Sequence, residues 1–308
     1  MTNPKILVTG GAGYKGVPLV TNLLARGFEV TLLDNFMYGF DSVLHLVSEP
    51  RLKIVQADIR NLDKALLSEF DVIYHLAGIS GMPACAANPH AAETINVQAT
   101  RDLVRALSRE QVLIYASTTS FYGATGQECD ETVPVQPVSL YGRTKYEAER
   151  IVQGRERSIS LRFATIFGVS PRMRTDLLVN DFAYKAVNDR AIVIFAGQSK
   201  RTFMHLEDAV AAYLFALDHA DRMAGQVFNA GDEQLNFSKL DIARAIQAHV
   251  RFELIDSSLA DLDVRNFLVS FQRIRALGYQ TVKTLDDGVR ELLKLYAFYR
   301  AGGKRSLI

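Results

Sequence analysis

The hydrophobic residues in the first half of the chain form short runs, and between these runs apolar residues recur every three or four positions. Short apolar runs predict strands that are buried on both faces, and the longer spacing predicts amphipathic helices. The predicted strands are residues 5–9, 29–33, 53–57, 72–76, 112–117 and 159–163, and the clearest predicted helices are 18–26 and 91–107. Because strands and helices alternate, we predict an α/β fold with a doubly wound parallel sheet.

The pattern changes after Gly168, where the elements become shorter and arginines accumulate. Residues 168–202 and 232–300 are therefore predicted to form a smaller α+β region. A buried helix at 206–217 and a strand at 226–230 indicate that residues 203–231 return to the first domain, which spans residues 1–167. Residues 301–308 are expected to be a loosely ordered tail.

Charge and cysteine content argue against a nucleic-acid-binding, membrane-attached or secreted protein. The 308 residues include 35 Lys and Arg and 34 Asp and Glu, for a net charge of +1, and neither sign forms a block, which argues against nucleic-acid binding and membrane-surface attachment. Cys85 and Cys129 have no CxxC spacing, the start of the chain runs directly into a predicted strand, and no apolar run approaches the roughly 20 residues of a membrane span. We therefore expect a cytoplasmic protein without a secretory leader. The six histidines lack ligand spacing, so no metal site is expected.

A glycine-rich stretch, VTGGAGYKGV, follows the first predicted strand. Gly10, Gly13 and Gly16 permit a tight turn, bring backbone N–H groups close to a pyrophosphate and let the next helix pack against the strand. Asp34 ends the second predicted strand, where its carboxylate suits the hydroxyls of an adenosine ribose. This order predicts a Rossmann-type dinucleotide site, and the alternative is a glycine-rich turn beside a surface aspartate. Residues 35–50 contain no Lys or Arg to hold a 2′-phosphate, which favours NAD over NADP.

Two residues of the glycine-rich stretch and the helix after it are unusual. Lys15 stands where an apolar side chain would ordinarily pack, so its charge either reaches toward the pyrophosphate or remains in solvent. Pro18 falls within the first predicted helix, and proline is tolerated there only in the first turn. The helix is therefore expected to begin late or to bend at Pro18.

The segment SLYGRTKYEAERIV places Tyr141 and Lys145 one turn apart on the same face of a predicted helix. An ammonium beside a phenol favours the phenolate, so we expect Lys145 to lower the pKa of Tyr141 and to make it a base. A predicted central strand ends in the hydroxyl residues Ser117, Thr118, Thr119 and Ser120, where one hydroxyl can hydrogen-bond a substrate oxygen; the alternative is a hydroxyl-rich turn after a strand. Tyr279 and Lys283 have the same spacing, but they follow a glycine in a loop-like setting and are interpreted as a chance match.

Together these motifs resemble the extended short-chain dehydrogenase/reductase family, and within it the NAD-dependent nucleotide-sugar epimerases and dehydratases. The resemblance covers almost the whole chain. The matching segments are Gly10-Gly11-Ala12-Gly13-Tyr14-Lys15-Gly16, Asp34-Asn35, Ala57-Asp58-Ile59, His75-Leu76-Ala77-Gly78, Asn96, Ser117-Thr118, Tyr141 with Lys145, Leu161-Arg162-Phe163 and Arg201-Thr202-Phe203-Met204-His205.

The resemblance implies roles for these residues. Thr118, Tyr141 and Lys145 would be catalytic. The cofactor NAD would be bound by Gly10, Gly13, Tyr14, Lys15, Gly16, Asp34, Asn35, Asp58, Ile59, Ala77, Gly78, Asn96, Ser117, Tyr141, Lys145 and Phe163, with Asp58 and Ile59 at the adenine and Phe163 at the nicotinamide. The substrate would be bound by Thr118, Thr119, Thr165, Arg174, Asn180, Arg201 and Arg265, and the guanidinium groups of Arg201 and Arg265 suit its diphosphate.

Two departures from the family pattern narrow the reaction. Thr119 and Ser120 stand where the hexose dehydratases carry an Asp-Glu pair, so water elimination lacks its acid and base. Thr165 replaces the common asparagine after the Leu-Arg pair, which puts the usual substrate contact in doubt. With the segment SPRMRTDLLVNDF after it, this variant resembles a branch acting on sugar nucleotides in surface-polysaccharide pathways, including heptose-type dehydrogenases.

The resemblance therefore implies NAD-dependent oxidation at C4 of a nucleotide-linked sugar, by a 4-epimerase or a 4-dehydrogenase. The alternatives are an NADPH-dependent 4-ketosugar reductase and a catalytically silent dinucleotide-binding regulator. The family also implies a homodimer, formed through the helix at residues 92–107 and the helix that carries Tyr141. No nucleic-acid or membrane partner is expected.

Overall fold

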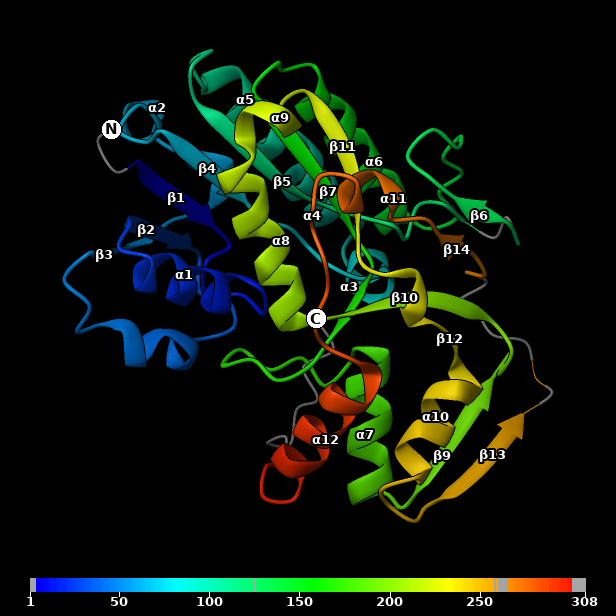
Figure 1. The fold of residues 1–308 in the computed structure, drawn as a ribbon. Coiled ribbons are helices and arrows are strands. Elements are labelled where there is room, and N and C mark those ends of the chain that lie inside the picture. Colours follow the sequence, from blue (N-terminus) through cyan, green and yellow to red (C-terminus); the bar gives the residue numbers. More distant parts are fainter. Residues whose placement is uncertain (1–3, 124–125, 258, 260–264, 301–308) are drawn as a thin grey trace.

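A seven-stranded parallel sheet forms the centre of the computed structural model, which describes residues 4–123, 126–257, 259 and 265–300 (Figure 1). The predicted tail at 301–308 lies outside the described residues. The strand order is β3-β2-β1-β4-β5-β7-β11, and the order reverses between β1 and β4. The strands are β1 (Lys5–Thr9), β2 (Glu29–Asp34), β3 (Leu52–Gln56), β4 (Val72–His75), β5 (Val112–Thr118), β7 (Ser158–Phe163) and β11 (Gln226–Ala230). The predicted doubly wound sheet is confirmed, and every predicted strand agrees to within one residue at either end.

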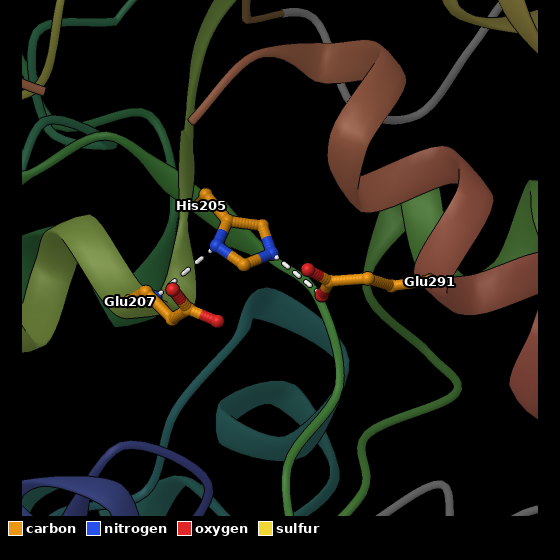
Figure 2. Close-up of side chains that lie close together, drawn as sticks. All are labelled: His205, Glu207 and Glu291. Atoms are coloured by element: carbon orange, nitrogen blue, oxygen red, sulfur yellow. Dashed lines mark hydrogen bonds and ion pairs between the residues drawn. The ribbon is translucent and has the colours of Figure 1, made fainter. Parts of the chain in front are cut away.

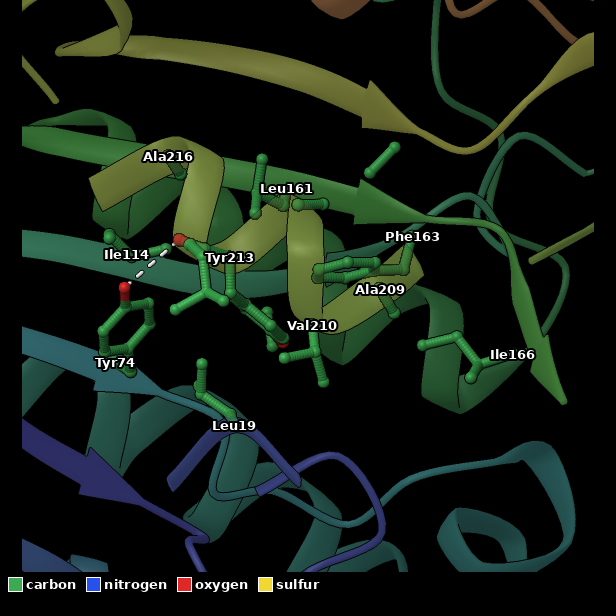
Figure 3. Close-up of a cluster of buried hydrophobic side chains, with 14 of the residues drawn as sticks. Leu19, Tyr74, Ile114, Leu161, Phe163, Ile166, Ala209, Val210, Tyr213 and Ala216 are labelled. Carbon is green, nitrogen blue, oxygen red and sulfur yellow. Dashed lines mark hydrogen bonds between the residues drawn. The ribbon is translucent and has the colours of Figure 1, made fainter. Parts of the chain in front are cut away.

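Both faces of the sheet are covered, because successive strand residues point to opposite sides. On β1, Ile6 and Val8 belong to one hydrophobic core and Leu7 to the other, and all three are fully buried. Figure 3 shows the first core, where the Tyr74 hydroxyl donates a hydrogen bond of 3.1 Å to the carbonyl oxygen of Tyr213. Two-sided burial explains why central strands such as β1 and β4 are mainly apolar, whereas the edge strand β3 is more exposed.

The helices form two layers. The first core contains residues of α1 (Gly16–Ala25), η1 (Asp41–Leu46), α8 (Leu206–Asp218), α9 (Ala220–Met223) and α11 (Gln272–Arg275). The second core contains residues of η2 (Ile59–Asn61), α2 (Lys64–Leu67), α5 (Ala99–Ala106) and α6 (Leu140–Gln153). The short helices α3 (Met82–Ala87) and α4 (Pro89–Ala92) and the π-helical segment η3 (Glu93–Gln98) contact α6.

Two predicted helices differ in detail from the structure. The helix α1 begins at Gly16, so Pro18 lies in its first turn, where a backbone N–H has no partner within the helix to lose. The prediction of a late start was therefore wrong. The helix predicted at 91–107 is divided into α4, η3 and α5. A wide π turn changes the direction of side chains along a helix, and it carries Asn96.

A third core lies below the large sheet in Figure 1, where α7, α10 and α12 pack together. These helices are α7 (Leu178–Asn188), α10 (Lys239–Gln247) and α12 (Leu285–Tyr296), and a short turn, η4 (Glu233–Leu235), precedes β12. Three small sheets accompany them: β12 (Asn236–Ser238), β10 (Lys200–His205) and β8 (Thr165–Phe167); β13 (Glu253–Ser257) with β9 (Ala191–Phe195); and β14 (Leu268–Val269) with β6 (Glu128–Cys129). Within the described ranges, every helix is too short or too polar to serve as a membrane span.

Candidate active site

A cavity of about 680 Å³ lies along the carboxyl ends of β1, β2, β4, β5 and β7. Ligands of open parallel sheets bind at this edge, beside the point where the strand order reverses. The predicted site residues that line it are Gly10, Gly13, Tyr14, Lys15, Gly16, Asp34, Asn35, Asp58, Ile59, Ala77, Gly78, Ser117, Thr118, Tyr141, Phe163, Thr165, Arg174, Arg201 and Arg265. The predicted residues Asn96, Thr119, Lys145 and Asn180, all of which are described, lie behind this lining.

The glycine-rich loop forms one wall of the cavity. Gly10 has a φ of 69°, and a Cβ atom there would lie 2.7 Å from the backbone nitrogen of Ala77. A Cβ atom at Gly16 would collide with the carbonyl oxygen of Gly10, so the start of α1 approaches the loop only because both residues are glycines. The helix N-terminus therefore reaches the cavity, and a pyrophosphate fits there.

Asp34 lies at the end of β2, beside the glycine-rich loop in the cavity wall. Its carboxylate accepts hydrogen bonds from the backbone N–H groups of Ala12 at 3.1 Å and Phe36 at 2.9 Å. Burial raises the pKa of Asp34, and these hydrogen bonds oppose that shift. A carboxylate held at the end of β2 beside the glycine loop fits the ribose of an adenine dinucleotide. The donor set of the cavity is therefore compatible with NAD.

The loops after β3 and β4 complete this half of the cavity. Asp58 caps η2 and pairs with Arg60, whose hydrogen bonds lower the pKa of Asp58. Asn96 does not face the cavity; its side chain accepts a hydrogen bond from the N–H of Ile79 at 2.7 Å and donates one to the Ile79 carbonyl at 3.0 Å. Its function in this structure is to hold the backbone that follows Gly78.

Thr118 and Tyr141 meet at the opposite end of the cavity. Burial raises the pKa of Tyr141, whereas hydrogen bonds from Ser80 and Thr118 and the charge of Arg174 lower it. The expectation that Lys145 lowers the pKa of Tyr141 is therefore wrong: the pKa is raised by burial, and the groups that oppose this shift are Ser80, Thr118 and Arg174. Tyr141 and Thr118 nevertheless line the same end of the cavity, and the Thr118 hydroxyl is near enough to lower the pKa of Tyr141.

Two lysines lie near this end, and each faces an aromatic ring. The Nζ atom of Lys145 is 4.1 Å from the ring centroid of Tyr115. The Nζ atom of Lys15 is 4.5 Å from the centroid of Phe163 and 5.6 Å from that of Tyr213, so it turns inward rather than into solvent. Burial lowers the pKa of each lysine to about 7; Arg174 also lowers the pKa of Lys15, and Lys15 also lowers that of Lys145.

A buried polar network supports the catalytic end from behind. The Ser117 hydroxyl donates to the carboxylate of Glu149 at 2.6 Å, and Arg162 forms a bidentate pair with the same carboxylate. Arg162 also donates to the Tyr122 hydroxyl at 2.8 Å, and this hydroxyl donates to Asn229 at 2.7 Å. The network joins β5, α6, β7 and β11, so the Ser117 hydroxyl serves the scaffold.

Two of the predicted substrate residues, Arg174 and Asn180, lie in the segment after β8 and at the start of α7. Arg174 lines the cavity, pairs with Asp176 and donates to the Ser80 hydroxyl at 3.3 Å. Asn180 is fully buried: its amide donates to the carbonyl oxygen of Arg174 at 2.8 Å and its oxygen accepts from the N–H of Gly168 at 3.0 Å. Asn180 therefore holds the loop that presents Arg174.

The remaining predicted substrate residues lie around the strand ends. Thr165 begins β8 and lines the cavity, as does the buried Arg201 of β10. Arg265 also lines the cavity and donates a hydrogen bond of 2.9 Å to the Ser120 hydroxyl. The Thr119 hydroxyl donates to the carbonyl oxygen of Phe163 at 3.2 Å, so it is turned into the protein.

Ser80 and Arg172 are cavity residues that the sequence analysis missed. Ser80 follows β4, and its place beyond the carboxyl end of a central strand was a usable signal. The guanidinium of Arg172 lies 4.3 Å from the ring centroid of Tyr38, and its charge lowers the pKa of Asp34. Only the fold brings Arg172 to the end of β2, so a search restricted to residues 35–50 could not find it.

A second polar cluster lies beside the C-terminal helix (Figure 2). His205 is held between Glu291, whose carboxylate is 3.0 Å from its Nε2 atom, and the backbone N–H of Glu207. Ligand atoms of these three residues lie within 4.8 Å of one another. The ammonium of Lys283, however, pairs with Glu207 at 3.2 Å and with Glu291 at 3.4 Å, so this cluster contains its own cation. Tyr279 donates to the carbonyl oxygen of Asp208 at 2.7 Å and helps to anchor the same loop.

Comparisons with known proteins agree with this geometry. The model of the NAD dependent epimerase/dehydratase family matches residues 6–231. An uncharacterized UDP-glucose epimerase, YtcB, of Bacillus subtilis is 31% identical over 246 residues, covering 74% of this chain and 76% of that protein. UDP-glucuronate 4-epimerase 3 of Arabidopsis thaliana is 28% identical over 346 residues, covering 98% of this chain and 78% of that protein.

A solved structure shows the same fold. The UDP-glucuronic acid 4-epimerase of Bacillus cereus, in complex with UDP-glucuronic acid and NAD, aligns with a TM-score of 0.82 and 26% identity, covering 95% of this chain and 99% of that one. The family model alone matches well over half of the sequence. This chain belongs to the NAD-dependent epimerase/dehydratase family, the nucleotide-sugar branch of the extended short-chain dehydrogenases/reductases.

Proposed function

We propose that this protein binds NAD and oxidises C4 of a nucleotide-linked sugar, as a 4-epimerase or a 4-dehydrogenase. The observation that carries the proposal is one continuous cavity that is lined by dinucleotide-binding features at one end and by both Thr118 and Tyr141 at the other. Relatives named as UDP-glucose and UDP-glucuronate epimerases support the substrate class. The residues proposed for NAD are the glycine loop, Asp34 and the cavity residues after β3 and β4.

In the proposed reaction, Thr118 donates a hydrogen bond to the C4 oxygen and Tyr141 accepts the C4 hydroxyl proton. NAD held by the glycine loop and Asp34 would supply the hydride acceptor, so that C4 would be oxidised to a ketone while NAD is reduced to NADH. Arg174 and Arg201 line the same cavity and are proposed to bind anionic groups of the substrate. If the ketosugar rotates in the cavity and recovers the hydride on its other face, the product is the epimer. If the ketosugar leaves the protein, the reaction is a dehydrogenation.

A buried tyrosine acts as a base near neutral pH only if its surroundings lower the pKa of its phenol. Burial raises the pKa of Tyr141, and the Thr118 and Ser80 hydrogen bonds oppose that shift. An oxidised nicotinamide carries a positive charge, and its binding nearby would favour the phenolate further. Tyr141 is therefore proposed to become an effective base only after NAD is bound.

The test is proton NMR of the protein with stoichiometric NAD and UDP-, GDP- or dTDP-linked sugars, beginning with UDP-glucuronate and UDP-glucose. Absorbance of the reduced nicotinamide is followed in parallel. An epimer without accumulated NADH identifies a 4-epimerase, and a 4-ketosugar with NADH identifies a 4-dehydrogenase. Turnover that requires NADPH and a 4-ketosugar would favour the reductase alternative.

The Tyr141→Phe variant is the matched control, because it removes only the hydroxyl. Loss of turnover with retained NAD binding supports the proposal. If NAD binds but no sugar of the panel reacts with the unaltered protein, the proposal fails in favour of a dinucleotide-binding regulator.

We also propose a homodimer formed through α5 and α6, which pack side by side in one chain. Analytical ultracentrifugation at micromolar concentration tests this assembly, and a stable monomer would contradict it.

A further inference from the structure

Lys15 is a cation in electrostatically unfavourable surroundings. It is the N-cap residue of α1, where the positive end of the helix dipole disfavours a cation. Lys15 is half-buried in the cavity wall with its ammonium against the Phe163 ring, and among the described residues no carboxylate forms an ion pair with it. The charged groups that act on it most strongly are cations, namely Arg174 and, through their mutual effect, Lys145. A charge in this position is costly unless a ligand gains from it.

The direction of the Lys15 side chain indicates which part of a ligand it meets. A dinucleotide with its pyrophosphate at the start of α1 and its adenosine ribose at Asp34 must extend its nicotinamide the other way, toward the ends of β4, β5 and β7. The Lys15 ammonium lies on that side, above the ring of Phe163 at the end of β7. The helix N-terminus and the backbone of the loop remain for the pyrophosphate.

The oxidised nicotinamide ring carries a positive charge that the reduced ring lacks. An ammonium in the wall at this end of the cavity would repel the oxidised ring and would leave the uncharged reduced ring unaffected. We propose that Lys15 makes the protein bind NADH more tightly than NAD, and thereby raises the reduction potential of the bound cofactor. This inference rests on the proposed binding of NAD and on no particular sugar.

The proposal agrees with the chemistry of C4 oxidation. A more oxidising cofactor favours removal of hydride from the sugar and retention of the reduced cofactor. A positive cavity end also favours the Tyr141 phenolate. Lys15 is thus a positioning and tuning residue, not a catalytic one, because no step of the reaction transfers a proton or hydride to it.

The experiment measures dissociation constants for NAD and NADH separately, without sugar, by calorimetry and nicotinamide fluorescence at pH 6. The unaltered protein, Lys15→Met and Lys15→Arg are compared. Lys53→Met is the control, because it removes one lysine charge from an exposed position on β3. We expect Lys15→Met to lower the ratio of the NAD dissociation constant to the NADH dissociation constant at least tenfold. For a two-electron couple, a tenfold change lowers the reduction potential of the bound cofactor by about 30 mV.

The charge-retaining Lys15→Arg variant is expected to keep most of the preference for NADH, and Lys53→Met all of it. Equal weakening of NAD and NADH in Lys15→Met would overturn the proposal, because the charge would then act on the pyrophosphate that both forms share. Unchanged affinities would also overturn it and favour a role toward the substrate. If the unaltered protein binds neither cofactor, the proposed function and this inference both fail, whereas binding of both without discrimination defeats the inference alone.

Discussion

Replacing Glu149 with glutamine is expected to destabilise the protein strongly, although Glu149 touches no part of the cavity. The Glu149 side chain is fully buried and forms a bidentate pair with Arg162, which is itself 5% exposed. Glutamine preserves the size of the side chain but removes the negative charge. Arg162 then remains buried without a counter-charge, and the Ser117 hydroxyl loses its charged acceptor.

The expected loss of unfolding free energy in Glu149→Gln follows from the burial of both partners. Breaking a buried ion pair by changing one partner costs about 3–5 kcal/mol of unfolding free energy, because the remaining charge stays desolvated. A glutamine oxygen still accepts one hydrogen bond from Arg162, so the lower part of this range is expected. Glu147 lies two residues earlier on the same helix and pairs with Arg101 at the surface, where its side chain is 54% exposed. Glu147→Gln should therefore cost less than about 1 kcal/mol.

Urea denaturation of both variants, followed by far-ultraviolet circular dichroism without cofactor, measures the two losses. The reasoning also predicts that the double variant Glu149→Leu, Arg162→Met recovers part of the stability, since it leaves no unpaired charge. A loss for Glu149→Gln no larger than that for Glu147→Gln would refute the argument that this network holds α6 against the sheet.

Three further predictions concern the cavity. Tyr141→Phe should lower kcat about 10²-fold or more by removing the general base, while calorimetry shows NAD affinity close to that of the unaltered protein. Asp34→Ala should weaken NAD binding about tenfold or more through loss of charge-assisted hydrogen bonds to ribose, and an unchanged calorimetric affinity would remove the ribose assignment. Because burial lowers the pKa of Lys15 and Lys145 to about 7, the unfolded chain binds more protons than the folded one between pH 7 and the ordinary lysine pKa. Without cofactor, the unfolding free energy should therefore rise from pH 7 to pH 9, and Lys15→Met should reduce that rise in urea titrations.

The large sheet could be predicted from the sequence because the local hydrophobic pattern identifies each of its strands. Most of them are short, mainly apolar runs, since helices cover both faces, and the glycine loop marks where the first strand ends. The small sheets could not be predicted in the same way. β8 is three residues long and β14 only two, and each is stabilised by a partner distant in sequence, such as β10 or β6. Short strands of this kind depend on tertiary contacts rather than on their own pattern.

The cavity lining was largely predictable for a related reason. Ligand residues at the carboxyl ends of parallel strands have a fixed relation to the strands, so the position of Asp34 follows from its strand, whereas Thr118 and Phe163 are selected through the family resemblance. The direction of each side chain does not follow. Ser117 and Thr119 flank Thr118, yet their hydroxyls serve Glu149 and the backbone of Phe163.

The cations of the catalytic end illustrate what sequence and structure contribute separately. The sequence identifies Lys15 as unusual, but a lysine in a glycine loop can extend outward or inward, and only packing decides between the two. In the structure Arg174 has the carboxylate of Asp176, whereas Lys15 and Lys145 face the aromatic rings of Phe163 and Tyr115. Aromatic rings attract cations far less strongly than carboxylates do, so they hold the two lysines in place without neutralising them. The charge that remains is available to whatever enters the cavity, and it acts at the end where the proposed hydride transfer occurs.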